Sequence, residues 1–286
     1  MYAGINVLLA VSLNLVNGIS GQFSLGHAGF MSIGAYVSAY LSMNVFSGIE
    51  IPFFQMLLSL VSGGIVAGFF GYLIGLPTLR LKGDYLAIVT LGFGEIIRVV
   101  ILNINAVGGA RGLPGIPKLS SFSWVFGLSF ITVFFIFRLM KSYHGRALLA
   151  VREDEIAAES MGVNTTSQKV RAFAMSSFFA GTAGSLFAHY LTFLNPQSFD
   201  FNKSFEIVTM VVLGGLGSTS GAVIAGLSLT ILREALRPLQ EITHVDLRMV
   251  IYSLLLILMM LTRPNGLLGT KEIWNLKFRK KINERA

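Results

Sequence analysis

The chain has 286 residues, of which 53% are hydrophobic and 13% charged, and its mean hydropathy is +0.70. Soluble domains carry about 25% charged residues, so the composition excludes an ordinary soluble domain and indicates a protein embedded in a lipid bilayer. The absence of cysteine excludes disulfides and thiolate chemistry, and the net charge of +8 reflects basic residues at helix ends and in the tail rather than nucleic-acid binding.

Long apolar segments predict an all-α fold, a polytopic bundle of transmembrane helices with about 8–9 membrane segments, some of them broken or re-entrant. The unbroken candidate segments are residues 2–17, 28–45, 53–76, 84–102, 122–140, 170–193 and 247–262. Residues 1–270 are expected to form a single transmembrane domain, and residues 271–286 a basic cytoplasmic tail. The chain is apolar from its start and has no basic leader region, so no cleavable signal peptide is predicted.

The first break is expected between the first two segments, where glycines alternate with polar residues. Free donors and acceptors at helix ends could meet a zwitterionic solute there. A plain cytoplasmic turn, or tight helix contact through the run GHAGFMSIGA, would also explain the composition. The candidate pathway residues in this stretch are Asn17, Gly21, Gln22, Ser24, Gly26 and His27.

Two features within the next apolar segments carry competing interpretations. Gly64, Gly68, Gly71 and Gly75 share one face of segment 53–76, which indicates close helix packing or, less simply, a face lining a pathway. Glu95 and Arg98 share a face of segment 84–102, as either a structural ion pair or a proton-coupling site.

A polar island at residues 144–169 interrupts the apolar sequence and must project into water. Glu153, Asp154 and Glu155 precede two alanines and Gly162, a pattern that predicts a short, docked helix with these three acids in its first turn. A solvated acidic loop is the alternative. The island therefore indicates a shaped cytoplasmic surface for a partner.

The last unusual segment, 205–235, is apolar but broken by the glycines of the sequence GGLGSTSG. Each half is short for a membrane crossing, so the segment predicts either two short spans or a re-entrant hairpin. Gly214, Gly215 and Gly217 are added to the candidate pathway residues, together with Glu95.

Most of the 22 lysines and arginines lie in 77–83, 138–171 and the tail from Arg263. The positive-inside rule places these parts, and the C-terminus, in the cytoplasm. Counting back places the N-terminus outside, so a further helix upstream of this sequence is expected.

The motifs of catalysis are missing from the sequence. It has no G-x-S-x-G elbow, and the glycine run lacks the lysine of a phosphate-binding loop. His27, His144 and His189 are isolated from carboxylates, which favours packing or interface roles over metal binding. We expect no enzyme, no metal and no cofactor on this chain.

Four blocks in order resemble the inner-membrane permeases of branched-chain amino-acid ABC transporters, most closely the M-type subunit of the Liv systems. They are NLVNGISGQFSLGHAGFMSIGAY (14–36), LKGDYLAIVTLGFGEIIRVV (81–100), GRALLAVREDEIAAESMGVN (145–164) and VVLGGLGSTSGAVIAG (211–226). The resemblance covers essentially the whole chain. It implies a permease domain in the inner membrane of a bacterium or archaeon.

The resemblance also implies the partners: a second, H-type permease subunit, two ATPase subunits that hold the ATP, and a periplasmic solute-binding protein. Segment 152–162 is similar to the E-A-A loop through which such permeases dock on their ATPases. It departs from that pattern, because the expected glutamate falls at Ile156 and the trailing Leu-Pro is absent. The implied docking residues are Arg152, Glu153, Asp154, Glu155, Ala157, Ala158, Glu159 and Gly162.

The function implied is import of leucine, isoleucine and valine or related small solutes, driven by ATP hydrolysis on the partners. Urea, short amides or other amino acids are alternative solutes for the same scaffold. A proton-coupled transporter using Glu95, a passive facilitator, and a membrane enzyme or receptor are the rival classes.

Overall fold

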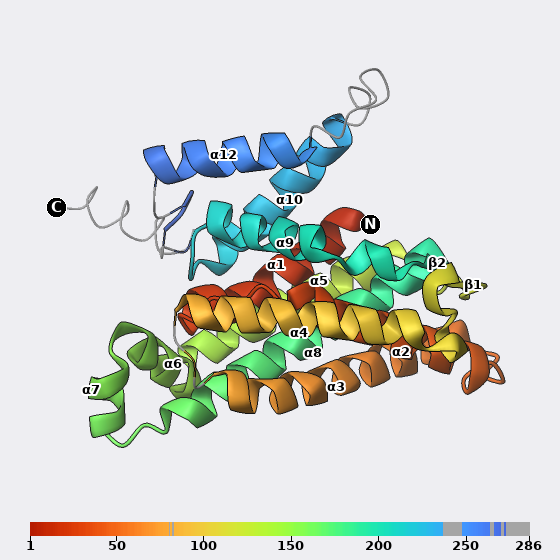
Figure 1. Cartoon of the computed structure of the whole chain (residues 1–286), viewed down its shortest axis with the longest axis horizontal. Coiled ribbons are helices and arrows are strands. Elements are labelled where there is room, and N and C mark those ends of the chain that lie inside the picture. The colour runs from red at the N-terminus through yellow and green to blue at the C-terminus, as the bar shows by residue number, and fades with distance from the viewer. Residues whose placement is uncertain (80, 82, 237–247, 264–265, 270–271, 273–286) are drawn as a thin grey trace, which may run out of the picture.

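The computed structural model describes residues 1–286 except 80, 82, 237–247, 264–265, 270–271 and 273–286. The predicted tail therefore lies outside the described residues apart from Glu272, as do Arg80, Lys82 and most of the 236–246 loop. The described chain forms a bundle of helices, with two short helices protruding at one end (Figure 1). We call this end of the bundle the α7 end.

The observed elements follow the predicted segments closely. The long helices are α1 (Tyr2–Asn14), α2 (His27–Asn44), α3 (Pro52–Thr78), α4 (Asp84–Asn103), α5 (Phe122–Lys141), α8 (Thr165–Leu191), α9 (Phe201–Gly214), α10 (Thr219–Ala235) and α12 (Arg248–Thr262). The short elements are a π-helix (Leu15–Ile19), α6 (Tyr143–Glu153), α7 (Glu155–Ser160), 3₁₀ turns at Asn105–Val107, Gly109–Arg111 and Pro196–Phe199, and strands β1 (Leu113–Pro114) and β2 (Phe193–Leu194). The strands pair antiparallel, with Leu113 opposite Leu194.

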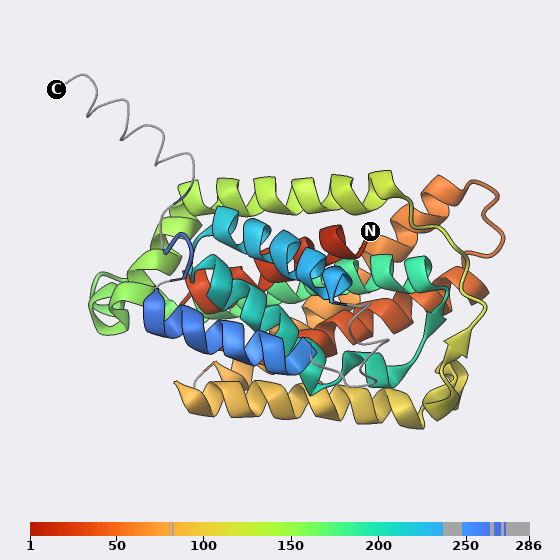
Figure 2. The ribbon, with the colours of Figure 1, turned by 90° about the horizontal axis from the view of Figure 1, so that it is seen from above.

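Helix α1 runs through the interior, between α5 on one side and α4 on the other (Figure 2). Leu8, Leu9 and Leu13 are fully buried, and so are the polar residues Ser12 and Asn14. A largely apolar helix that is covered on all sides is a core helix rather than a lipid-facing one. The rest of the bundle is therefore organised around α1.

Glycines let α2, α3 and α8 approach to backbone contact. A Cβ atom on Gly34 would collide with the backbone of Gly181, and one on Gly184 with the carbonyl oxygen of Met31. Ser185 Oγ crosses this contact and donates a hydrogen bond of 3.2 Å to the Gly34 carbonyl. Small residues and such interhelical bonds are what hold helices together in lipid.

The predicted glycine face of α3 belongs to the same contact. Gly64 and Gly68 lie against Phe178, Gly71 against Ser177, and Gly75 against Phe173, all of them on α8. The face is filled by a neighbouring helix, so the packing interpretation is confirmed.

Four of the described helices are long and apolar enough to cross a membrane: Tyr2–Ile19, Pro52–Thr78, Asp84–Asn103 and Phe122–Lys141. The more polar α2 and α8 are largely buried against other helices, where serine and threonine can bond to backbone carbonyls. The all-α, polytopic fold is thereby confirmed.

Segment 205–235 is broken as predicted, but the break is shorter than the glycine run. Helix α9 has 14 residues and α10 has 17, which at about 1.5 Å per residue is shorter than the ~30 Å hydrocarbon core. The two form a helical hairpin, and Thr219 to Gly221 already belong to α10. We call Gly214–Ser218 the tip; it lies at the α7 end of the bundle (Figure 1).

Candidate functional site

The polar island folds into two helices rather than one. Asp154 separates them, with an extended backbone, and its Oδ1 accepts hydrogen bonds from the amides of Ile156 and Ala157 at 2.9 and 3.0 Å. The short helix therefore begins at Glu155, whereas Arg152 and Glu153 belong to α6. The prediction of a short helix is confirmed, but the expectation that all three acids occupy its first turn is wrong, because Asp154 has become its N-cap.

Helix α7 is tied to the bundle on one side and open on the other. Lys169 Nζ on α8 lies 2.6 Å from Glu155 Oε1, and Ala158 is buried. Ile156 and Met161 are 76% and 84% exposed. Ile156 was noted in the sequence only as a departure from the E-A-A pattern and Met161 not at all, although an apolar residue inside a charged island was the available signal.

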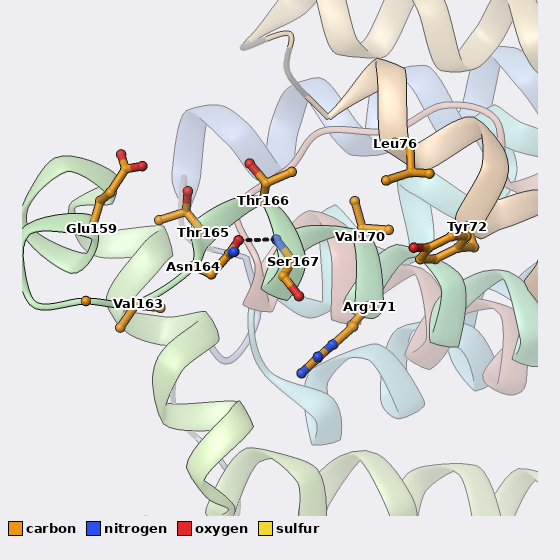
Figure 3. Close-up of a pocket in the computed structure, with 11 residues that line it drawn as sticks. Tyr72, Leu76, Glu159, Val163, Asn164, Thr165, Thr166, Ser167, Val170 and Arg171 are labelled. Carbon is orange, nitrogen blue, oxygen red and sulfur yellow. Dashed lines mark hydrogen bonds between the residues drawn. The ribbon is translucent and has the colours of Figure 1, made fainter.

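A pocket of about 670 Å³ lies at the foot of these helices, between α7, the start of α8 and the last turns of α3 (Figure 3). Its lining mixes apolar and polar side chains, including Tyr72, Leu76, Glu159, Asn164 and Arg171. Asn164 Oδ1 caps α8 by accepting from the Ser167 amide at 2.9 Å, the bond drawn in Figure 3. Gly162, in a left-handed conformation (φ +82°), makes the turn between α7 and α8 and also lines the pocket.

Arg152 joins the protruding helices to the broken ones. Its Nη1 donates a hydrogen bond of 2.9 Å to the carbonyl oxygen of Gly18, in the π-helix that ends the first membrane segment. A Cβ atom on Gly217, in the hairpin tip, would lie 2.7 Å from the same nitrogen. One guanidinium therefore touches both breaks in the membrane helices.

The two breaks also contact each other directly. The Gly217 amide donates to Asn14 Oδ1 at 2.9 Å, and a Cβ atom on Gly18 would collide with the Gly217 backbone. On the other side of Arg152, a Cβ atom on Gly21 would lie 2.8 Å from the arginine Cγ. We call Asn14, Gly18, Gly21, Arg152 and Gly217 the junction. The junction connects α6 to both breaks through hydrogen bonds and close approaches to the backbone.

The remaining pathway candidates of the first break are mostly engaged in local structure. Asn17 and Ser24 exchange two hydrogen bonds, His27 Nε2 lies 2.9 Å from Ser12 Oγ, and a Cβ atom on Gly26 would meet the Thr90 backbone. Residues 20–26 form a turn without regular structure, in which Gly21 and Phe23 are exposed, whereas residues 26–30 are buried against α4 and other helices. Gln22 is different: its buried amide oxygen and nitrogen have no partner among the described residues.

Glu95 lies apart from the junction. Its Oε2 accepts from Arg98 Nε at 2.7 Å, and the two side chains are 36% and 25% exposed. The structural ion pair is therefore confirmed. Within the described part of the chain no group of three or more histidines and carboxylates could hold a metal ion.

Sequence analysis missed a second, more deeply buried charge cluster at the far end of the hairpin. Glu206 on α9, 8% exposed, lies 3.0 Å from Lys203 Nζ and 3.2 Å from Arg233 Nη1 on α10. Lys203 Nζ also reaches Asn6 Oδ1 on α1 at 3.3 Å. The signal in the sequence was an acid and a base at i, i+3 in α9. Their partner on α10 could not be read from spacing.

Changing Glu206 to Gln is expected to lower the free energy of unfolding by about 3 kcal/mol, because two cations would remain at the cluster without a counter-charge. Glu50→Gln, the same chemical change in an exposed loop residue, should shift it by less than about 0.5 kcal/mol. Thermal unfolding in detergent measures both. Equal midpoints for the two variants would show that the cluster does not stabilise the fold.

The fold and the junction define a class: polytopic helical membrane proteins whose protruding helices contact the broken membrane helices. The family model described as branched-chain amino acid transport system, permease component, matches residues 1–260. The chain belongs to this family, which confirms the resemblance seen in its sequence and makes it a multi-pass transport permease component.

Curated relatives from bacteria and archaea agree. The high-affinity branched-chain amino acid transport system permease protein LivM of Salmonella typhimurium is 39% identical, covering 92% of this chain and 68% of the relative. The probable LivM permease of Methanocaldococcus jannaschii is 27% identical over 95% of this chain and 83% of its own length. The LivH permease of Escherichia coli is 27% identical over 93% of this chain and 92% of its own length. No solved structure gives a significant match.

Proposed function

We propose that this chain is the M-type permease subunit of an ATP-driven importer of branched-chain amino acids in the inner membrane of a bacterium or archaeon. Its partners would be an H-type permease, two ATPase subunits that hold the ATP, and a periplasmic solute-binding protein. The names of the relatives, the branched-chain amino acid permeases LivM and LivH, support branched-chain amino acids as the solute and a pair of different permease subunits. The distribution of basic residues supports a cytoplasmic α7 end and C-terminus.

One observation carries the mechanical part of the proposal: the hydrogen bond from Arg152 to the Gly18 carbonyl. Because α6 and α7 protrude at this end, an ATPase bound there can move them when it binds ATP. Arg152 then transmits the movement to the π-helix and to the hairpin tip, and the two breaks change which side of the pathway is open. No chemistry on the solute is required of this subunit. The two states of the pathway must differ in the contacts that the ATPase and the breaks make in each.

The docking surface follows from exposure and charge. Ile156 and Met161 offer apolar side chains to a partner, and the nearby residues Glu153 and Glu159 add exposed acids. The pocket beside α7 could receive a side chain of the same partner. Apolar anchors within a polar rim are typical of protein interfaces.

Changing both Ile156 and Met161 to Ser is therefore expected to weaken ATPase binding about tenfold or more, since each anchor contributes at least ~1 kcal/mol. Co-purification of the tagged permease with its ATPases measures the loss. Ile51→Ser, at an exposed isoleucine beyond the other end of the bundle, is the matched control. An unchanged ATPase yield with the double variant would place the docking surface elsewhere.

Two further changes in the docking segment should act in the same direction. Reversing the charges at Glu153 and Asp154 removes an exposed acid and the N-cap of α7. A bulky residue at Gly162 has space, since no heavy atom lies within 4 Å of its Cβ position, but it is strained at φ +82°. Membrane insertion is expected to be intact in both.

The main rival is a transporter coupled to protons through Glu95. The pairing of Glu95 with Arg98 argues against it, because the ion pair gives Glu95 a structural role. ATP-dependent uptake into proteoliposomes holding the whole complex separates the two. The proposed function requires uptake to stop without ATP and to survive Glu95→Gln.

A further inference from the structure

The chain after α12 returns to the hairpin tip. The Leu267 amide donates a hydrogen bond of 2.9 Å to the Leu213 carbonyl, and the Leu268 amide one of 3.3 Å to the Gly214 carbonyl. These are the last carbonyls of α9, which have no partner within their own helix. The backbone after α12 therefore completes the end of α9.

Glu272 does the same for the beginning of α10. Its Oε1 accepts from the Thr219 amide at 2.7 Å, and its Oε2 accepts from the Ser220 amide at 3.0 Å and from Ser220 Oγ. Free amides and a positive partial charge mark a helix N-terminus, so a carboxylate is the group that suits it. Ser218 Oγ accepts a hydrogen bond of 3.0 Å from the next amide, that of Gly221.

We call Gly266, Leu267, Leu268 and Glu272 the clasp. The clasp lies directly against the backbone of the tip, because a Cβ atom on Gly266 would lie 2.5 Å from the Gly215 Cα. The tip has its other contacts with Asn14, Gly18 and Arg152 at the junction. The tip is thus held by two groups of residues, one connected to α6 and one to the end of the described chain.

We propose that the clasp is a positioning element for transport, and that Glu272 keeps the hairpin tip against the junction so that a displacement of α6 moves the hairpin. This inference rests on the proposed function. The family model ends at residue 260, before the clasp begins. Glu272 acts through the tip and has no role in binding the solute.

The physical reason is the cost of leaving buried backbone groups unpaired. Without the clasp, two carbonyls of α9 and two amides of α10, all on buried residues, need other partners. The tip would then move to a position where these groups are paired, and Gly217 would lose its contact with Arg152. The ATPases would still hydrolyse ATP, but less of their movement would reach the pathway.

The test uses the complete complex, with its second permease, ATPases and binding protein, in proteoliposomes loaded with ATP. Leucine uptake and ATP hydrolysis are measured together for the native protein and for Glu272→Gln, which removes the charge and one acceptor oxygen. We expect about tenfold more ATP hydrolysed per leucine imported, in line with loss of a charge-assisted hydrogen bond. Glu284→Gln, the same charge change further along the tail, is the control and should leave the ratio unchanged.

A purely structural role for Glu272 predicts a different result, in which uptake and hydrolysis fall in parallel with the amount of assembled complex. That result, or an unchanged ratio, overturns the inference. If Glu272→Gln does not assemble, Ser220→Ala decides the question: it removes one contact of the clasp, and a raised ratio supports the proposal whereas a native ratio rejects it. Uptake by the native complex without ATP would instead overturn the proposed function.

Discussion

Gly184→Leu is expected to prevent α2 and α8 from packing together. The added side chain would enter a space already filled by the Met31 carbonyl, with the Ala35 amide nitrogen 2.9 Å from its Cβ. Backbone cannot rotate away as a side chain can, so the helices must separate and give up the contacts between them. We expect a loss of at least ~3 kcal/mol in the free energy of unfolding, a large fraction of the about 5–15 kcal/mol by which folded proteins are stable.

Gly127→Leu provides the matched control, since Gly127 also lies within a long helix but has no heavy atom within 4 Å of its Cβ position. The measurement is the yield of monodisperse protein in mild detergent, followed by its thermal midpoint. Similar yields and midpoints for the two variants would mean that α2 and α8 are not in backbone contact.

Arg152→Ala should have the largest effect on transport among substitutions that leave the fold intact. It removes a charged hydrogen bond to the Gly18 carbonyl and the side chain that fills the space between Gly21 and Gly217. Such a bond contributes about 1.5–3 kcal/mol, so uptake is expected to fall between about tenfold and a hundredfold. Arg152→Lys should be intermediate, because an ammonium keeps the charge but loses the planar fork.

The control for Arg152 is Arg146→Ala on the same helix, whose exposed guanidinium bonds only to the nearby Lys141 carbonyl among the described contacts. Uptake is compared at equal amounts of bound ATPase, which separates transmission from docking. If Arg152→Ala lost its ATPase instead of its uptake per complex, Arg152 would be a docking residue, as its place in the E-A-A-like segment first implied.

The helices themselves were predictable because lipid leaves the backbone few choices. A run of apolar residues must satisfy its amides internally, so nearly every long segment became a helix within a few residues of its predicted limits. The same reasoning located the break near Gly214, where glycines end one helix and a serine begins the next. The short helix of the polar island was found in the same way, from local composition.

The candidate site was less predictable. Asn14, Gly18, Arg152 and Gly217 meet at the junction although they are far apart in the sequence, and nothing in their spacing indicates it. Glu95, by contrast, could be paired from spacing alone: the sequence predicted either an ion pair with Arg98 or a proton-coupling site, and the structure shows the ion pair.

By itself the sequence determined the class of protein, the helices, the two breaks and the protruding segment, because each depends on residues that are neighbours along the chain. Only the tertiary structure decided what the breaks touch: Arg152 on one side of the tip, Glu272 on the other. Those contacts depend on how closely helices approach, and that distance is set by glycines on different helices meeting face to face.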